Sequence, residues 1–320
     1  MKKDTGSHKK LLALIAIIAV IALLHYLTPT EPHTYHRLHI ILRKLYFLPP
    51  VMAAAWFGLR GACATALAVS LLFGTHAFLD WPGNYMEQAN QLGELAGFWV
   101  AGVVPGLLFD RQRELLREVA AANEETLLAL VSALDLRERN TRLHSQRVRE
   151  YAELLAERCG SDAATRREIG FGALLHDVGK IAVPDHILLK ADTLSEEEWQ
   201  VMRRHPEAGY RIVQRIGFLR NAAQIVRAHH ERYDGTGYPR GLRGDEIPPG
   251  ARIFMVADVY DALTSPRPYR TTMSHEEAAS EIVKRQGSKF DPAVVTAFLS
   301  IPVGELKAIA ARYREADVGD

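Results

Sequence analysis

The stretch Leu175-His-Asp-Val-Gly-Lys-Ile-Ala-Val-Pro-Asp185 places an imidazole, His176, directly beside a carboxylate, Asp177. A single histidine is more often a hydrogen-bonded core residue than a ligand. Five more side chains of the same chemistry stand on predicted helices around this pair: His144, His205, His229, His230 and Asp258. Seven imidazoles and carboxylates, some of them adjacent in sequence, are hard to explain as unrelated core residues. They indicate a metal site.

The ligand types restrict which ions this site would hold. Neutral imidazoles and carboxylates suit divalent iron, manganese, nickel or zinc, and no cysteine accompanies them to select a softer metal. Seven ligands exceed the number that one ion would take, so we expect two ions that share the carboxylate of Asp177. Two ions about 3.5–4 Å apart would bind and ionise a water molecule for in-line attack on phosphorus.

The overall composition conceals two chemically different regions. The 320 residues carry 39 basic and 38 acidic side chains, for a net charge of +1, and the length suits about two domains. Only 14 of these charges lie in residues 1–110, whereas 63 lie in residues 111–320. The near-neutral total argues against a binder of polymeric nucleic acid. The charge-poor region suggests a membrane domain.

Four apolar segments within residues 1–110 predict a four-helix transmembrane domain. The first, Leu11–Leu27, has no charge, would form about 25 Å of helix, and follows a lysine-rich start. A signal peptide is the alternative, but Thr28-Pro-Thr-Glu-Pro32 lacks a small-residue cleavage site, which favours a retained anchor. The other segments are Leu45–Leu59, Gly61–Leu79 and Leu92–Phe109, the last interrupted only by Glu94.

The distribution of charge predicts a topology. With the lysine-rich start inside, four crossings place Arg111 and all later residues in the cytoplasm. We therefore expect a multi-pass protein of the cell inner membrane with a cytoplasmic catalytic domain. His33, His36 and His39 are spaced three apart on the expected outer side and could bind a metal or sense protons. Interfacial histidines without a ligand are the alternative.

Residues 111–135 predict a helical linker that leads into a catalytic domain over residues 136–320. The sequence from Asp110 to Arg139 is highly charged and lacks Gly and Pro. Its apolar residues recur mostly three or four positions apart: Leu116, Val119, Leu127, Leu130, Val131 and Leu134. Such a narrow stripe could join two chains as a short coiled coil, or it could dock on the catalytic domain. We expect a homodimer.

Six stretches of the charged half together resemble the HD-GYP family, a branch of the HD phosphohydrolases. The resemblance extends from about Ala133 to Leu299 and rests on Leu134–Val148, Leu175–Asp185, His205–Gly209, His229–Pro239, Ala257–Arg270 and Phe290–Pro292. The resemblance implies an all-helical domain that uses iron or manganese to hydrolyse cyclic di-GMP to linear pGpG or onward to GMP. The expected fold class of the whole chain is therefore all-α.

The resemblance also implies roles for individual residues. One ion would be held by His144, His176, Asp177 and Asp258, and the other by Asp177, His205, His229 and His230. Lys180, four residues past His176 and on the same face if the helix continues, would meet a phosphate oxygen. Arg267 and Arg270 would grip the phosphates or bases of the substrate, and Gly237 and Tyr238 would shape the substrate loop.

The sequence departs from the family beside the first ligand. Asn140 stands where members that bind a third metal have Glu, and an amide is a poor replacement for a charged ligand. We therefore expect two ions, with cleavage stopping mainly at pGpG. Arg142 replaces the Gly of the usual Thr-Gly pair and puts a bulky cation near the rim of the site.

Other functions are compatible with the same residues. A non-catalytic receptor for the nucleotide would keep the fold, but such receptors usually lose ligands, and none is lost here. An HD hydrolase of another cyclic dinucleotide or nucleotide phosphoester is the third possibility. The membrane half more loosely resembles the multi-helix sensor regions that precede bacterial signalling kinases, through Leu45–Pro50 and Trp56–Gly61. It would receive a signal or act as a passive anchor.

Overall fold

The computed structural model describes residues 5–28, 36–80, 85–138, 143–266 and 272–315. These residues are mostly helical and form two isolated bridges but no strand, in agreement with the expected all-α class. They divide into two compact units, residues 1–123 and 124–320. The boundary falls inside a helix, within the region where the sequence predicts the linker.

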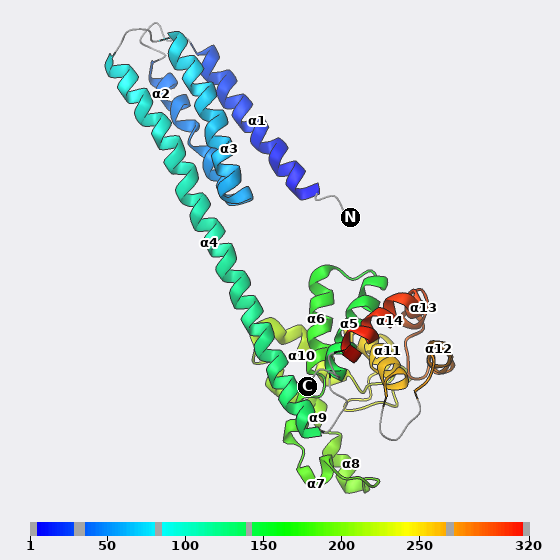
Figure 1. Ribbon diagram of the computed structural model, residues 1–320. Coiled ribbons are helices and arrows are strands. Elements are labelled where there is room, and N and C mark those ends of the chain that lie inside the picture. Colours follow the sequence, from blue (N-terminus) through cyan, green and yellow to red (C-terminus); the bar gives the residue numbers. More distant parts are fainter. Residues whose placement is uncertain (1–4, 29–35, 81–84, 139–142, 267–271, 316–320) are drawn as a thin grey trace. The chain divides into compact units, whose positions relative to one another are not determined.

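The first unit is built from long apolar helices. It contains α1 (Thr5–Leu27), α2 (His36–Leu45), α3 (Leu48–Asp80) and the first part of α4 (Tyr85–Glu138) (Figure 1). Three helices are long and apolar enough to cross a membrane, over Gly6–Leu27, Arg37–His76 and Ala89–Arg137. The sequence predicts four separate segments. The second and third lie in one helix, α3, whose backbone is broken at Gly58, so four crossings remain a prediction.

The bend of α3 lies at Gly58, where the backbone leaves the helical region with φ 69° and ψ −159°. The imidazoles of His39 and His76 lie 5.2 Å apart, centroid to centroid. An unbroken helix would separate these residues by roughly 55 Å, so the chain must reverse between them. A β-carbon on Gly61 would lie 3.3 Å from the carbonyl oxygen of Ala53, which places the reversal at Gly58.

Two acidic residues of α4 hold the helices of the first unit together. Asp110 accepts a hydrogen bond from the backbone N–H of Leu59, just after the bend, at 2.9 Å. Glu94, the one acidic residue inside the fourth predicted segment, pairs with Arg43 at 3.1 Å and with Lys44 at 2.8 Å. Charges inside apolar helices are tolerated when they are paired in this way.

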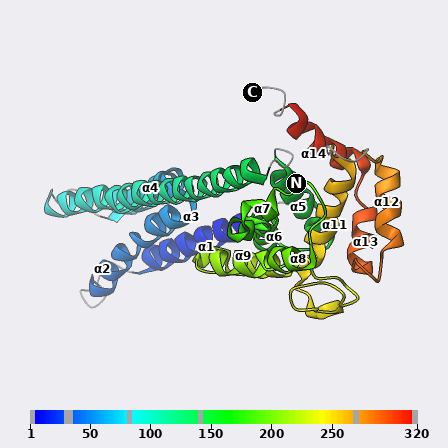
Figure 2. The ribbon, with the colours of Figure 1, turned by 90° about the horizontal axis from the view of Figure 1, so that it is seen from below.

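The second unit consists of shorter helices. They are α5 (His144–Arg158), α6 (Ala163–Leu175), η2 (Val178–Ala182), α7 (Asp185–Leu188), α8 (Glu196–Met202), α9 (His205–Val213), η3 (Gly217–Leu219), α10 (Arg220–Ala228), η4 (Gly244–Glu246), α11 (Pro249–Thr264), α12 (His275–Lys284), α13 (Pro292–Leu299) and α14 (Val303–Glu315). Figure 2 shows α12 and α13 beside α11, which contacts both of them.

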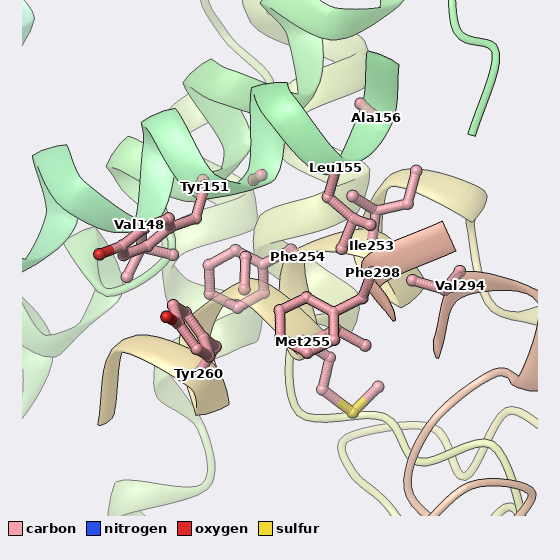
Figure 3. Packing of buried hydrophobic residues seen from close by; sticks show 14 of the residues in the cluster. Val148, Tyr151, Leu155, Ala156, Ile253, Phe254, Met255, Tyr260, Val294 and Phe298 are labelled. Atoms are coloured by element: carbon pink, nitrogen blue, oxygen red, sulfur yellow. The ribbon is translucent and has the colours of Figure 1, made fainter. Parts of the chain in front are cut away.

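The main hydrophobic core of this unit lies between α5 and α11. Val148 and Tyr151 of α5 face Phe254 and Tyr260 of α11, and Phe298 of α13 completes the layer (Figure 3). The rings of Tyr151 and Tyr260 meet edge to face with centroids 5.2 Å apart, a favourable aromatic geometry. The core thereby fixes the relative positions of the two helices that carry His144 and Asp258.

The apolar residues of the predicted linker are partly buried and partly exposed. Leu127 and Val131 belong to a second core with residues of α6 and α10, and Leu134 is also buried. Leu116, Val119 and Leu130 remain exposed on α4. The end of α4 therefore packs against α6 and α10 within the second unit, as one of the two interpretations of the stripe expects.

Gly58 and Gly74 offer a matched test of the bend in α3. Ala at position 58 would place an L-residue in the left-handed region and its β-carbon against the carboxylate of Asp110, at a cost of about 1–2 kcal/mol. Gly74 has open space around it, so Gly74→Ala should not destabilise. We expect Gly58→Ala to lower the melting temperature of the full chain in detergent and Gly74→Ala to leave it unchanged or higher. Equal melting temperatures would contradict the bend.

Candidate metal centre

The seven predicted ligands lie mostly at helix ends. His144 is the first residue of α5 and His205 the first of α9, while His176 and His229 follow directly after α6 and α10. Asp177 precedes η2, His230 follows His229, and Asp258 lies within α11. Contacts of α6 with α5 and α10, and of α11 with α5, bring these ends together.

The structure gathers the ligands into two groups around Asp177. His144, His176 and Asp258 form one group and His205, His229 and His230 the other, with ligand atoms within 4.8 Å of one another in each. One oxygen of Asp177, Oδ2, lies 3.0 Å from Nε2 of His176. The other, Oδ1, lies 3.4 Å from Nε2 of His205 and 3.9 Å from Nε2 of His229. The carboxylate therefore faces both groups.

Three of the histidines are oriented by the same kind of hydrogen bond. Nδ1 of His176 donates to the carbonyl of Ala173 at 2.8 Å, and His205 and His229 donate to the carbonyls three residues before them, at 2.8 and 2.6 Å. A carbonyl oxygen can only accept, so the proton resides on Nδ1 and Nε2 presents a lone pair. This arrangement is typical of histidines that bind a metal through Nε2.

His144 is oriented by Asp261, a residue that sequence reasoning did not assign. Nδ1 of His144 lies 2.7 Å from Oδ2 of Asp261, and Arg147 donates to the same carboxylate at 2.8 and 3.1 Å. Asp261 is fully buried. It stands three residues after Asp258 and Arg147 three after His144, so both pairs share a helix face. These three-residue spacings are the sequence signal that could have identified Asp261.

The electrostatics differ between the two groups. Burial alone would lower the pKa of His144, but hydrogen bonds that it donates to the carboxylates of Asp258 and Asp261 raise it to about 9. Burial, with His205 as the next contributor, lowers the pKa of His230 to about 3. The pKa of Asp177 is well below its usual value, because His176 and Lys180 outweigh the effect of burial. The His205 group is therefore neutral and faces an ionised carboxylate, as metal ligands require.

Lys180 reaches the site by a different route from the one expected. The α-helix stops at Leu175, and Lys180 lies in the 3-10 helix η2, so the expectation of one helical face shared with His176 is wrong. Its ammonium group instead contacts Oδ2 of Asp177 at 2.7 Å. The tighter turn brings Lys180 onto Asp177, three residues away.

A family model described as "HD domain" matches residues 128–294, more than half of the chain. The chain belongs to the HD domain family. Over 186 residues it is 43% identical to the cyclic di-GMP phosphodiesterase response regulator RpfG of Xanthomonas campestris pv. campestris, covering 58% of this chain and 49% of that protein. A cyclic di-GMP phosphodiesterase of Thermotoga maritima is 40% identical over 195 residues, covering 60% of this chain and 53% of that protein.

A third relative has a different named substrate. The 3'3'-cGAMP-specific phosphodiesterase 2 of Vibrio cholerae is 37% identical over 196 residues, covering 61% of this chain and 37% of that protein. The chain spans about half the length, or less, of these three curated relatives.

A buried glutamate fixes the loop beside the second histidine group of the HD domain. Glu231 is fully buried and accepts hydrogen bonds from the backbone N–H groups of Arg240 and Leu242, at 2.8 and 3.0 Å. A β-carbon on Gly237 would collide with the backbone of Glu231, so only glycine permits this approach. Tyr238 consequently stacks on His230, with ring centroids 4.7 Å apart.

Other predicted site residues of the HD domain lie outside the described residues. These are Arg267 and Arg270, expected to contact substrate, and Asn140 and Arg142, expected to alter the first ligand group. A residue that sequence reasoning did not assign, Arg137, lies at the end of α4. It donates to the carbonyls of Lys180 and Val183 and to Asp185, and so anchors the segment that carries Asp177.

Gly179 allows η2 to approach α9 in the HD domain. A β-carbon on Gly179 would collide with the carbonyl oxygen of His205 and the N–H of Gly209, which are backbone atoms that cannot rotate away. We expect Gly179→Ala to cost about 1–3 kcal/mol and to lower the melting temperature of the full chain by several degrees. Gly217→Ala, with open space around it, is the matched control. If both variants melt like wild type, the close approach is not required.

Proposed function

We propose that this chain is an HD-GYP phosphodiesterase that hydrolyses cyclic di-GMP at a site of two divalent metal ions. One observation carries the proposal: the two oxygens of Asp177 face two separate groups of buried ligands. Relatives at 40–43% identity that are named cyclic di-GMP phosphodiesterases support the substrate.

The residues present fit two iron or manganese ions. His144, His176 and Asp258 would hold one ion, His205, His229 and His230 the other, and Asp177 would contribute to both. The Nδ1–H bonds to backbone carbonyls leave Nε2 lone pairs free to coordinate. Imidazole and carboxylate donors are those that divalent iron and manganese accept. When bound, the ions would supply a water molecule of lowered pKa and polarise the phosphate.

The protein's own residues would position and stabilise the substrate. The ammonium group of Lys180, held against Asp177, would offset negative charge that develops on a phosphate oxygen during attack. Tyr238, stacked on His230, and the close-packed Gly237 would shape the loop that receives the nucleotide. Arg267 and Arg270 are proposed to bind its phosphates or bases. Asn140 favours two ions over three, and with two ions we propose that cleavage stops mainly at pGpG.

We further propose that residues 1–110 anchor the protein in the inner membrane with the catalytic domain in the cytoplasm. The support is the apolar length of three helices and the reversal of α3 at Gly58, which together allow four crossings. A homodimer through α4 is proposed from its exposed apolar residues Leu116, Val119 and Leu130.

The first test of the proposed function replaces the shared carboxylate. Full-length protein in nanodiscs, loaded anaerobically with Fe²⁺ or Mn²⁺, should hydrolyse cyclic di-GMP, with pGpG quantified by chromatography. Asp177→Ala should reduce turnover to background because both ligand groups lose a donor, whereas Asp192→Ala, which removes an exposed carboxylate, should retain it. Metal-loaded wild type that binds the nucleotide without product would instead identify a receptor.

The substrate requires a separate comparison because one relative is named for 3'3'-cGAMP. Hydrolysis of cyclic di-GMP and 3'3'-cGAMP by the same preparation should favour cyclic di-GMP in kcat/KM. A higher kcat/KM for 3'3'-cGAMP would contradict the proposed substrate but would agree with the proposed phosphodiester hydrolysis.

The second test concerns the carboxylate that orients His144. Asp261→Asn keeps the size of the side chain but removes the charge that supports the imidazole, so we expect a 10–100-fold loss of metal affinity. Competition with a chelator measures it. Asp245→Asn, the same change at an exposed residue that pairs with Arg252, is the control. Equal affinity in Asp261→Asn and wild type would contradict an orienting role.

A further inference from the structure

A second histidine cluster lies in the first unit, outside the proposed catalytic site. His25 near the end of α1, His39 of α2 and His76 of α3 place their ligand nitrogens within 4.8 Å of one another, and all three side chains are buried. The sequence drew attention to His33, His36 and His39. His33 lies outside the described residues, as does the side chain of His36, and His39 instead meets two histidines that are remote in sequence.

The spacing of the nitrogens matches coordination of one ion. Nε2 of His25 and Nε2 of His39 are 3.2 Å apart. Two nitrogens bound tetrahedrally at the usual metal–nitrogen distance would be about 3.3–3.4 Å apart. The proposed catalytic site contains the same separation, since Nε2 of His205 and Nε2 of His229 are also 3.2 Å apart.

The surroundings of the cluster are mainly aromatic, and the guanidinium of Arg43 lies over the ring of Phe73, 5.6 Å from its centroid. The ring of His25 stacks on His76 at 4.0 Å and lies near Phe73 and Tyr46, at 6.1 and 5.4 Å between centroids. Burial of the three rings keeps water away from their ligand nitrogens, which lie within reach of one another and of a single ion.

The ligand set indicates the class of ion. No Asp, Glu or Cys among the described residues joins the three histidines within the cluster. Hard ions such as Mg²⁺, Ca²⁺ and Mn²⁺ prefer oxygen donors, whereas neutral imidazole suits the late first-row ions copper and zinc. The absence of a carboxylate distinguishes this cluster from the proposed catalytic site, where Asp177 and Asp258 accompany the histidines.

We propose that His25, His39 and His76 form a binding site for one late transition-metal ion, Cu⁺ or Zn²⁺, within the apolar helical bundle. The site is separate from the ligands of the HD domain. It would allow the first unit to respond to a metal ion of its own. The ion would be held where α1, α2 and the part of α3 after Gly58 meet.

The test measures bound metal per full-length chain in nanodiscs. Protein is exposed in parallel to Zn²⁺ or, under anaerobic reducing conditions, to Cu⁺, desalted, and analysed by elemental mass spectrometry. His39→Leu and His76→Leu should each lose about one equivalent of the favoured ion relative to wild type. His8→Leu removes an exposed histidine from α1 and should lose none. His76→Cys offers a thiolate at the same position and should retain the ion.

A complementary variant leaves the cluster intact. With His144, His176, His205 and His229 all replaced by alanine, which removes two ligands from each group of the HD domain, the chain should still retain about one equivalent of Zn²⁺ or Cu⁺. If this variant binds neither ion, or if the Leu variants bind as much as wild type, the proposal is overturned. Cyclic di-GMP hydrolysis by wild type is measured separately, so failure of the catalytic proposal is distinguishable from failure of this one.

Discussion

The carboxylate of Asp177 is the constraint on which the second unit depends. A buried carboxylate is costly unless charges and hydrogen bonds compensate for lost water. Here Lys180 and His176 contact one oxygen, and His205 approaches the other. Removal of any one partner would leave charge uncompensated in the interior. The positions of η2, α6 and α9 are therefore coupled through a single side chain.

The packing of the helices also orients the histidines that face Asp177. Histidines at helix ends can donate Nδ1–H to a carbonyl of the preceding turn, because carbonyls near the end of a helix lack an intrahelical partner. His176, His205 and His229 all use this geometry. The main core reaches the same point, since Phe254 packs 4.9 Å from the ring of His176. The packing of α11 and the orientation of His176 therefore depend on each other.

The sequence predicted the chemistry of the site better than its geometry. The seven ligands follow from residue type and order, and the structure brings all seven together. The 3-10 turn at Lys180 was missed because periodicity does not show where a helix ends without Gly or Pro. Asp261 was missed because its value depends on facing His144, 117 residues away. Such distant contacts are set by packing, so the three-residue spacing of Asp258 and Asp261 does not by itself identify His144 as the partner.

The first unit shows the same limit. Four apolar runs were recognisable, but the joining of two of them at Gly58 depends on a left-handed residue covered by Asp110 of another helix. That reversal also explains why the regular spacing of His33, His36 and His39 did not predict the cluster that contains His39. His39 and His76 lie 19 residues before and 18 residues after Gly58, so folding the chain there superposes them, while regular spacing along one segment does not. The bundle cluster therefore arises from a chain reversal, whereas the cluster of the HD domain follows sequence motifs. They differ in charge, because the catalytic group has carboxylates within reach and the bundle cluster has imidazoles alone. A divalent ion among carboxylates is close to neutralised, whereas among neutral imidazoles in an apolar bundle it keeps its full charge, which favours an ion of lower charge such as Cu⁺ in the bundle.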